Sequence, residues 1–210
     1  MSYRSVVNHG GTAGPSIGYT AVILPVYPVY AIDMNINLQP ILENDRIRLN
    51  PLRQADEETL YQAASDPNIW TQHPNPDRWK KEVFHTFFQG AMQSGGAFSI
   101  IDKVSGNTIG STRFYDYRQE HRSIFIGYTF FACAYWGTGT NTTVKSIMLN
   151  YIFDFVDTVY FHIGAANIRS QKAIERIGAD KIGEEEVIYF GELPRLNFVY
   201  RIRKETWRSK

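Results

Sequence analysis

A glycine-rich turn directly before a helical pattern is the part of this sequence best suited to chemistry. Residues 134–153 read AYWGTGTNTTVKSIMLNYIF, so that Gly137 and Gly139 flank Thr138. The first turn of a helix has four N–H groups without intrahelical partners, and the helix dipole adds roughly half a positive charge at that end. Glycine lets the backbone approach a ligand closely and reach positive φ. The pattern therefore predicts an anion site, with a phosphate as the natural occupant; the simpler alternative is a tight turn without a ligand.

The common nucleotide motifs do not fit this turn. Lys145 comes too late for G-x-x-x-x-G-K-[ST], and Thr142 occupies the place of the last glycine in G-x-G-x-x-G. A different phosphate carrier is therefore expected. A module that binds nucleotide phosphates stays open as an alternative, and it predicts that ATP or GTP binds as tightly as that carrier. No G-x-S-x-G elbow of a serine hydrolase occurs.

The surrounding elements follow from hydrophobic periodicity. The apolar face of the helix after the turn is expected to hold Val144, Ile147, Met148, Tyr151, Ile152 and Phe155. Strands are expected at 45–52, 97–103, 108–118, 122–131, 158–164, 180–190 and 195–203, and further helices at 53–67, 77–96 and 167–178. Asn167 is the expected N-cap of the last helix, and Gly178 its stop. This order predicts a mixed α/β sheet with helices on its faces.

Composition restricts the class of protein. The 210 residues suit one domain with an appendage, and residues 1–40 form an N-terminal extension with almost no charge and no clean period. The extension's apolar run is interrupted by Pro25 and Pro28 and is shorter than the roughly 20 residues of a membrane helix. A net charge of +1 does not indicate a nucleic-acid binder. The single cysteine favours a cytoplasmic location, and the five scattered histidines predict no metal site.

Several stretches taken together resemble one enzyme family. They are IGY at 126–128, WGTG at 136–139, and N-x-x-S-x-x-A-x-x-x-x-G, represented by Asn167, Ser170, Ala173 and Gly178. In this order, from about residue 45 to 207, the sequence resembles the GNAT acetyltransferases, and it looks closest to the branch of ribosomal-protein N-terminal acetyltransferases.

The resemblance implies the acyl-CoA N-acyltransferase fold over residues 41–210. This fold is a mixed α/β arrangement with a splayed, mostly antiparallel sheet of about six to seven strands and helices on both faces. It also implies that acetyl-CoA is the co-substrate and a primary amine the acceptor, with direct transfer in a ternary complex and no nucleic acid or membrane as partner. A homodimer stays open. The residues expected to bind the coenzyme are Phe130, Trp136, Gly137, Thr138, Gly139, Thr140, Asn141 and Asn167.

The sequence departs from the family at three positions. Ala134 replaces the usual first glutamine or arginine of the phosphate loop, Phe125 a frequent glutamate, and Ile174 a frequent tyrosine that protonates the departing thiolate. We therefore expect Ser170, directly or through water, to supply that proton, and backbone N–H groups near Tyr128 to stabilise the oxyanion. A non-catalytic acyl-CoA-binding regulator is the alternative function.

A missing carboxylate base favours a weakly basic acceptor. An α-amino group has a pKa of about 8, whereas a lysine side chain has a pKa of about 10.4, so an α-amine needs far less help to lose its proton. The N-terminal amine of a protein or peptide, or a small amine, is therefore the expected acceptor. Acidic or basic groups that could still reach the acceptor side are Glu57, Glu58, Glu82, Asp116 and His121.

Two other features are expected to be structural. Cys133 lies in the apolar run FACAY without a histidine partner in sequence, which favours burial over a role as nucleophile. The three glutamates at 184–186 are expected to form a solvated bend before a strand.

Overall fold

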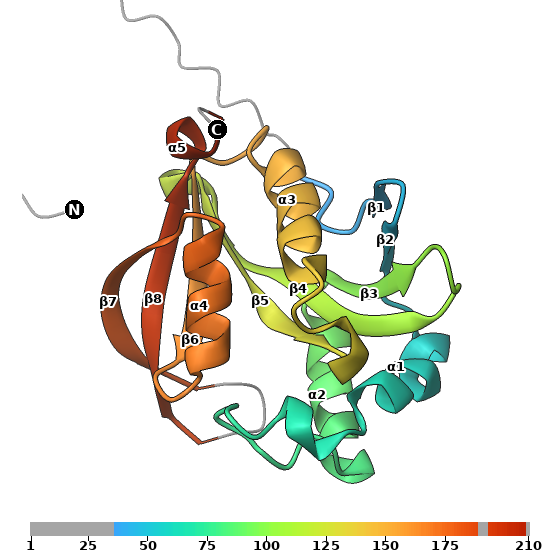
Figure 1. The fold of residues 1–210 in the computed structure, drawn as a ribbon. Coiled ribbons are helices and arrows are strands. Elements are labelled where there is room, and N and C mark those ends of the chain that lie inside the picture. The colour runs from blue at the N-terminus through green and yellow to red at the C-terminus, as the bar shows by residue number, and fades with distance from the viewer. Residues whose placement is uncertain (1–35, 189–192, 209–210) are drawn as a thin grey trace, which may run out of the picture. The chain divides into compact units, whose positions relative to one another are not determined.

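A computed structural model describes residues 36–188 and 193–208 (Figure 1). Most of the expected N-terminal extension, residues 1–35, lies outside the described residues. The strands are β1 (Leu42–Glu43), β2 (Ile47–Pro51), β3 (Ala97–Asp102), β4 (Thr108–Arg118), β5 (Ser123–Phe131), β6 (Thr158–Gly164), β7 (Asp180–Val187) and β8 (Arg195–Arg203). The α-helices are α1 (Glu57–Ala64), α2 (Lys81–Gln93), α3 (Thr140–Ile152), α4 (Ile168–Arg176) and α5 (Lys204–Arg208).

The strands form one sheet in the order β1-β2-β3-β4-β5-β6-β8-β7. Neighbouring strands are antiparallel except for β5 and β6, which are parallel. The expected mixed, mostly antiparallel fold is therefore confirmed. The sheet has eight strands instead of six to seven, because the two-residue β1 is too short to produce a recognisable alternation.

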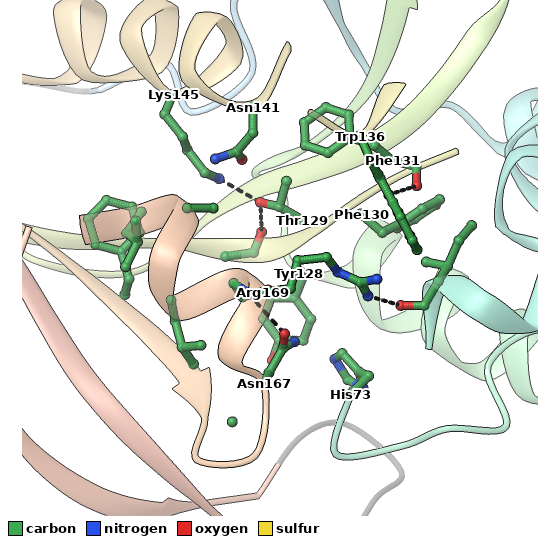
Figure 2. A pocket seen from close by; sticks show the side chains of 18 of the residues that line it. His73, Tyr128, Thr129, Phe130, Phe131, Trp136, Asn141, Lys145, Asn167 and Arg169 are labelled. Carbon is green, nitrogen blue, oxygen red and sulfur yellow. Dashed lines mark hydrogen bonds between the residues drawn. The ribbon is translucent and has the colours of Figure 1, made fainter. Parts of the chain in front are cut away.

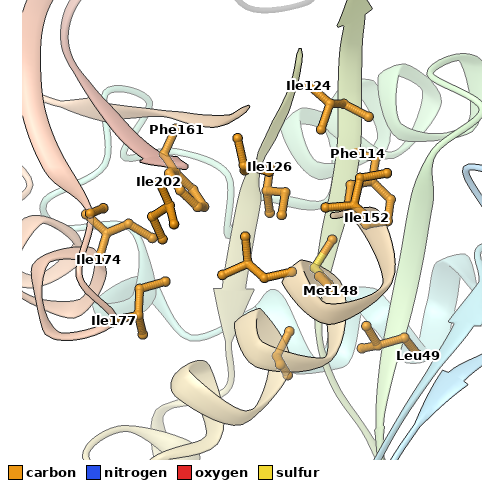
Figure 3. Close-up of a cluster of buried hydrophobic side chains, with 14 of the residues drawn as sticks. Leu49, Phe114, Ile124, Ile126, Met148, Ile152, Phe161, Ile174, Ile177 and Ile202 are labelled. Carbon is orange, nitrogen blue, oxygen red and sulfur yellow. The ribbon is translucent and has the colours of Figure 1, made fainter. Parts of the chain in front are cut away.

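Helices cover both faces of the sheet, as expected. Adjacent residues of β3 show the division, since Phe98 packs into one buried cluster and Ala97 into the other. The first cluster takes side chains from α3 and α4, including Met148 and Ile174, and is shown in Figure 3. The second takes side chains from α1 and α2, including Phe84.

Helix α3 buries a different face from the one the sequence indicates. Val144, Met148 and Ile152 are buried as expected, and the helix ends at Ile152, before Phe155. Three further residues of the helix are buried without having been expected, namely Thr140, Leu149 and Lys145, the last only 3% exposed. The helix therefore turns a cationic side chain toward the sheet.

The sheet opens between β5 and β6. Their pairing joins residues 123–125 to residues 158–160 and stops at Phe125, and the two strands run apart beyond that point (Figure 1). On its other side β5 pairs with β4, but the register shifts between Gly127 and Phe130. Tyr128 lies within this irregularity with φ of 52°, in the left-handed region that is rare for a bulky residue. The splayed sheet that the resemblance implies is thus confirmed, with β5 leaving β6 after Phe125.

The end of the chain corrects one expectation. Helix α4 begins after its N-cap Asn167, whose side chain accepts from the Ser170 N–H, and Gly178 follows it with φ of 92°, as expected. The glutamates at 184–186, however, are part of β7 and do not form a bend. The strand expected at 180–190 is present as β7, and because it is an edge strand, exposed along most of its length, it accommodates three consecutive glutamates.

Candidate functional site

A cleft of about 400 Å³ lies where β5 and β6 separate. Both strands line it, together with the N-terminal parts of α3 and α4 and the segment before α2, and Figure 2 shows many of its side chains. The residues predicted from the sequence that line it are Tyr128, Phe130, Trp136, Gly137, Gly139, Thr140, Asn141, Asn167 and Ser170. Thr138 is not among its lining residues. Its hydroxyl bonds the Tyr135 carbonyl at 2.8 Å and the Thr140 hydroxyl at 2.7 Å.

The glycine turn has the geometry that an anion site requires. Gly137 has φ of 72° and Gly139 has φ of 83°, and a Cβ placed on either glycine meets no atom within 4 Å. Gly139 is the N-cap of α3 and carries no side chain that caps the helix. The N–H groups of the first turn are therefore not capped by the N-cap residue, and the space beside the turn fits a phosphate-sized group.

Lys145 lies one helical turn after Asn141 and points from α3 toward β5 (Figure 2). Its Nζ donates to Thr129 Oγ1 at 2.5 Å and to Thr112 Oγ1 at 3.2 Å. Both acceptors are neutral hydroxyls, and burial lowers the pKa of Lys145 to about 7. A buried ammonium group without a carboxylate partner is costly, and such groups concentrate at functional sites.

The charged side chains in the described lining of the cleft are all cationic. The lining residues carry four cationic side chains, Arg78, Lys145, Arg169 and Arg176, and no carboxylate within the part of the chain that the structure describes. A cleft with this lining attracts anions and repels polycations.

Trp136 connects the turn to the body of the domain. Its Nε1 donates to the Phe131 carbonyl at 3.1 Å, and its ring packs against both buried clusters. Arg169 lies over the ring at 3.8 Å and donates to the Ile69 carbonyl at 2.9 Å. These contacts fix the position of the turn, so Trp136 is a packing residue that also borders the cleft.

Arg113 supports Tyr128 in its unusual backbone conformation. The Arg113 guanidinium lies 3.8 Å from the centre of the Tyr128 ring and donates to the Gly90 carbonyl at 3.0 Å. Burial lowers the pKa of Arg113 to about 10, so the side chain stays charged at neutral pH. The bulge is therefore a supported feature at the point where β5 leaves β6.

The start of α4 forms another wall of the cleft. Asn167 is buried, and its Oδ1 accepts from the Ser170 N–H at 3.1 Å. Ser170 is half-buried and lines the cleft. Ile174 also lines the cleft, but it is only 3% exposed and belongs to the core, so no acid group occupies this position.

The acidic and basic candidates named from the sequence are not brought together. Glu57, Glu58, Glu82, Asp116 and His121 are absent from the described lining of the cleft. Glu57 bonds His85 at 2.6 Å, Glu58 bonds Lys81 at 2.8 Å, and Asp116 bonds Arg118 at 2.6 Å. These three carboxylates therefore bond to neighbouring cationic or imidazole side chains outside the cleft.

Sequence reasoning missed several titratable groups that line the cleft, among them His73, Tyr115, Lys145 and His162. His73 is half-buried beside Arg78, with 3.1 Å between Nε2 and Nη1, and desolvation lowers its pKa well below the usual value. Position relative to the WGTG turn could have pointed to Lys145. No pattern in the sequence pairs Tyr115 with His162.

Cys133 is half-buried rather than fully buried as expected. Burial, and then a hydrogen bond to Asp66, raise the pKa of its thiol to about 11. The thiol is therefore protonated at neutral pH and a poor nucleophile.

Within residues 36–188 and 193–208, no helix has the length and apolar character needed to cross a bilayer. The same ranges contain no group of three or more His, Cys, Asp or Glu side chains arranged to hold a metal ion.

Known structures share this architecture. A GCN5-related N-acetyltransferase from Brucella melitensis aligns with a TM-score of 0.71 at 21% identity and 81% coverage of both chains. Mycobacterium smegmatis RimJ in complex with CoA-disulfide aligns with a TM-score of 0.61 at 16% identity, covering 80% of this chain and 87% of the other. A Vibrio cholerae–human chimera of the spermidine N-acetyltransferase SpeG aligns with a TM-score of 0.60 at 16% identity, covering 78% and 99%.

At these identities the structural matches establish the fold alone. A comparison with curated proteins gives no match. Residues 46–180, well over half of the chain, match the family described as the acetyltransferase (GNAT) domain. Family and fold agree with the glycine turn and the splayed strand, and the chain therefore belongs to the GNAT acetyltransferase family.

Proposed function

We propose that this protein is an N-acetyltransferase that moves the acetyl group of acetyl-CoA to a primary amine by direct transfer in a ternary complex. The observation that carries the proposal is the pairing of an uncapped helix start with a buried cation. The turn at residues 137–139 and the Lys145 ammonium open on the same cleft, and together they suit a pyrophosphate.

The residues of this chain divide into binding and reacting groups. Backbone N–H groups at 137–141, the Asn141 side chain and Lys145 would hold the pyrophosphate. The edge of β5 at 126–130, where pairing with β6 has stopped, would hold the pantetheine arm. Asn167, already an N-cap, lies beside this path and lines the same cleft.

The chemistry needs little from the protein beyond position and charge. Backbone N–H groups near Tyr128 would stabilise the developing oxyanion. The departing thiolate, whose pKa resembles the free-thiol value of about 8.5, needs only a weak proton donor. Ser170, directly or through water, is our candidate for this donor, because the Ile174 side chain has no acidic proton and is buried in the core.

The acceptor we propose is an N-terminal α-amine of a protein or peptide, or another weakly basic small amine. The cationic lining of the cleft opposes a polyamine, since a polycation would enter against Lys145, Arg169 and Arg176. The charge of the cleft thus separates two acceptor classes that the fold alone does not distinguish.

The test is a panel of peptides with free N-termini, small amines and polyamines, scored by release of free thiol from acetyl-CoA. We expect transfer to α-amines and weak or no transfer to spermidine. A preference for spermidine over every α-amine would contradict the acceptor class.

One rival function has an observation in its favour. Phe125 and Ile174 replace acid/base groups that are frequent in the family, and both are buried, which suits a regulator that binds acyl-CoA without catalysis. Transfer to any amine in the panel excludes this rival. Tight binding of acetyl-CoA without transfer to any acceptor would support it.

A further inference from the structure

Three polar side chains from three strands form a connected chain that ends in the cleft. Glu185 on β7 bonds His162 Nε2 on β6, and His162 Nδ1 lies 3.1 Å from the hydroxyl of Tyr115 on β4. His162 and Tyr115 line the cleft. The side chain of His162 is only 9% exposed, whereas that of Glu185 is half-exposed on the outer side.

The contact between Tyr115 and His162 crosses β5, which lies between β4 and β6 in the sheet. Gly127 of β5 makes this crossing feasible. A Cβ at Gly127 would lie 2.9 Å from Tyr115 Cε1 and 3.2 Å from the phenol oxygen. The absence of a side chain at this position therefore lets the phenol pass over β5 and reach the imidazole.

The hydrogen bonds fix where the protons lie. An ionised carboxylate only accepts, so His162 Nε2 carries the hydrogen that Glu185 receives. In the neutral ring Nδ1 then accepts from the Tyr115 hydroxyl. Burial is the largest influence on the His162 pKa and lowers it, while Glu185 and Asp116 oppose this effect and Arg118 adds to it. The ring is therefore neutral at pH 7 and able to take up a proton.

The phenol lies where chemistry is expected. Tyr115 packs against Tyr128 with 5.1 Å between ring centres, and against Gly127, at the point where β5 separates from β6. On the function proposed above, on which this inference rests, the thioester and the acceptor amine meet along this stretch. We propose that Glu185, His162 and Tyr115 form a proton relay that removes the proton from the acceptor amine.

The proton transfers of the relay account for every proton and bond in the reaction. The lone pair of a neutral amine forms the C–N bond at the thioester carbonyl, the C–S bond breaks, and its electron pair leaves with sulfur. The nitrogen gives its proton to the Tyr115 oxygen while the phenol proton passes to His162 Nδ1, and Glu185 stabilises the imidazolium. The thiolate takes one proton from Ser170 or water, and His162 returns one to solvent. Tyr115 touches the substrate, and Glu185 is a positioning residue.

The first test measures turnover with an α-amine peptide and acetyl-CoA. Tyr115→Phe and His162→Gln should each lower kcat about 100-fold, within the usual range for general acid–base catalysis, with the Kd of acetyl-CoA unchanged. The double variant should be no slower than either single variant, because the two groups act as one unit. Glu184→Gln, which removes the neighbouring charge on the same strand, is the matched control and should retain wild-type turnover.

The second test isolates the titration of His162 with an aromatic amine that stays unprotonated from pH 5 to 8. Wild-type kcat/KM should fall on the acid side, below the usual histidine pKa of about 6.5, as His162 becomes protonated. His162→Gln should abolish this decline. A wild-type profile that stays flat to pH 5, or an identical profile in His162→Gln, would overturn the relay.

The third test needs no turnover. The ¹⁵N shifts of the His162 ring at pH 7 should show the proton on Nε2 in the wild type, and Glu185→Gln should lower the ring pKa further. A ring with its proton on Nδ1 overturns the relay even if amine transfer is observed. A wild-type protein that acetylates no amine would instead overturn the proposed function, and the relay with it.

Discussion

Lys145 Nζ lies 2.5 Å from Thr129 Oγ1, so that helix α3 is bonded to the strand irregularity at the floor of the cleft. This contact places a cation of depressed pKa in the cleft that the glycine turn also lines. It gives the anion site a charge whose state depends on pH near neutrality.

The first prediction concerns stability. Burial lowers the pKa of Lys145 to about 7, so the unfolded chain binds one more proton than the folded chain between about pH 7 and 10.5. Stability should therefore rise with pH across this window, and the full cost of the ammonium is present below it. Lys145→Met should raise the free energy of unfolding by an amount on the order of a few kcal/mol at pH 6.5, and less at pH 9. Urea unfolding at both pH values checks this, with the exposed Lys172→Met as control; equal stability of Lys145→Met and wild type at pH 6.5 would contradict it.

The second prediction concerns binding. Because an anion favours the charged form of Lys145, binding of CoA should be accompanied by proton uptake near pH 7 to 8. Titration calorimetry in buffers of different ionisation enthalpy measures this uptake. Lys145→Met should lose it and bind at least tenfold more weakly, about 1.4 kcal/mol. The same uptake in both proteins would assign the proton to another group.

The third prediction addresses the glycine turn. Gly139→Val places a branched side chain in the space beside the helix start and strains a backbone with φ of 83°, so acetyl-CoA affinity should fall at least tenfold, about 1.4 kcal/mol. Gly106→Val is the matched control, since Gly106 has φ of 74° and similar open space but lies in the turn after β3. The control should suffer the same backbone strain and bind normally. Normal binding by a folded Gly139→Val protein would refute the loop assignment.

The fourth prediction is that Cys133 carries no acetyl group during the reaction. With its pKa raised to about 11, the thiol is a weak nucleophile at neutral pH. Cys133→Ala and Cys133→Ser should keep most of the activity in steady-state assays. Ping-pong kinetics together with an acetylated Cys133 in the mass spectrum would reverse this conclusion.

The fifth prediction concerns proton delivery to the thiolate. Ser170→Ala should lower kcat about 10- to 100-fold with little change in cofactor affinity, because the thiolate needs only a weak acid. The measurement is turnover from pH 6 to 9 with a reactive amine. An unchanged kcat would leave water as the donor, and lost affinity with normal kcat would make Ser170 a binding residue.

The fold was largely predictable from local patterns. The alternation at 108–118 and 122–131, the helix after the glycine turn, and the N-cap at Asn167 depend on neighbours in the sequence, and the structure confirms them. The two-residue β1 has no such local signal.

The site was only partly predictable, for a physical reason. The glycine turn is local, and its backbone geometry can be expected from its sequence. The contact between Tyr115 and His162 exists because Gly127 leaves space on an intervening strand, which involves three elements at once. The burial of Lys145 likewise depends on the rotation of α3 about its axis against the sheet. Hydrophobic periodicity alone predicted burial for the apolar residues next to it and not for Lys145 itself.

Edge strand β7 has a consequence for how this molecule meets its own copies. It carries three glutamates in a row at 184–186 on the outermost strand of the sheet. Exposed strand edges invite backbone pairing with other chains, and closely spaced like charges oppose it, since two such edges would bring their carboxylates together. The row of glutamates therefore protects the sheet against edge-to-edge pairing between copies of the molecule.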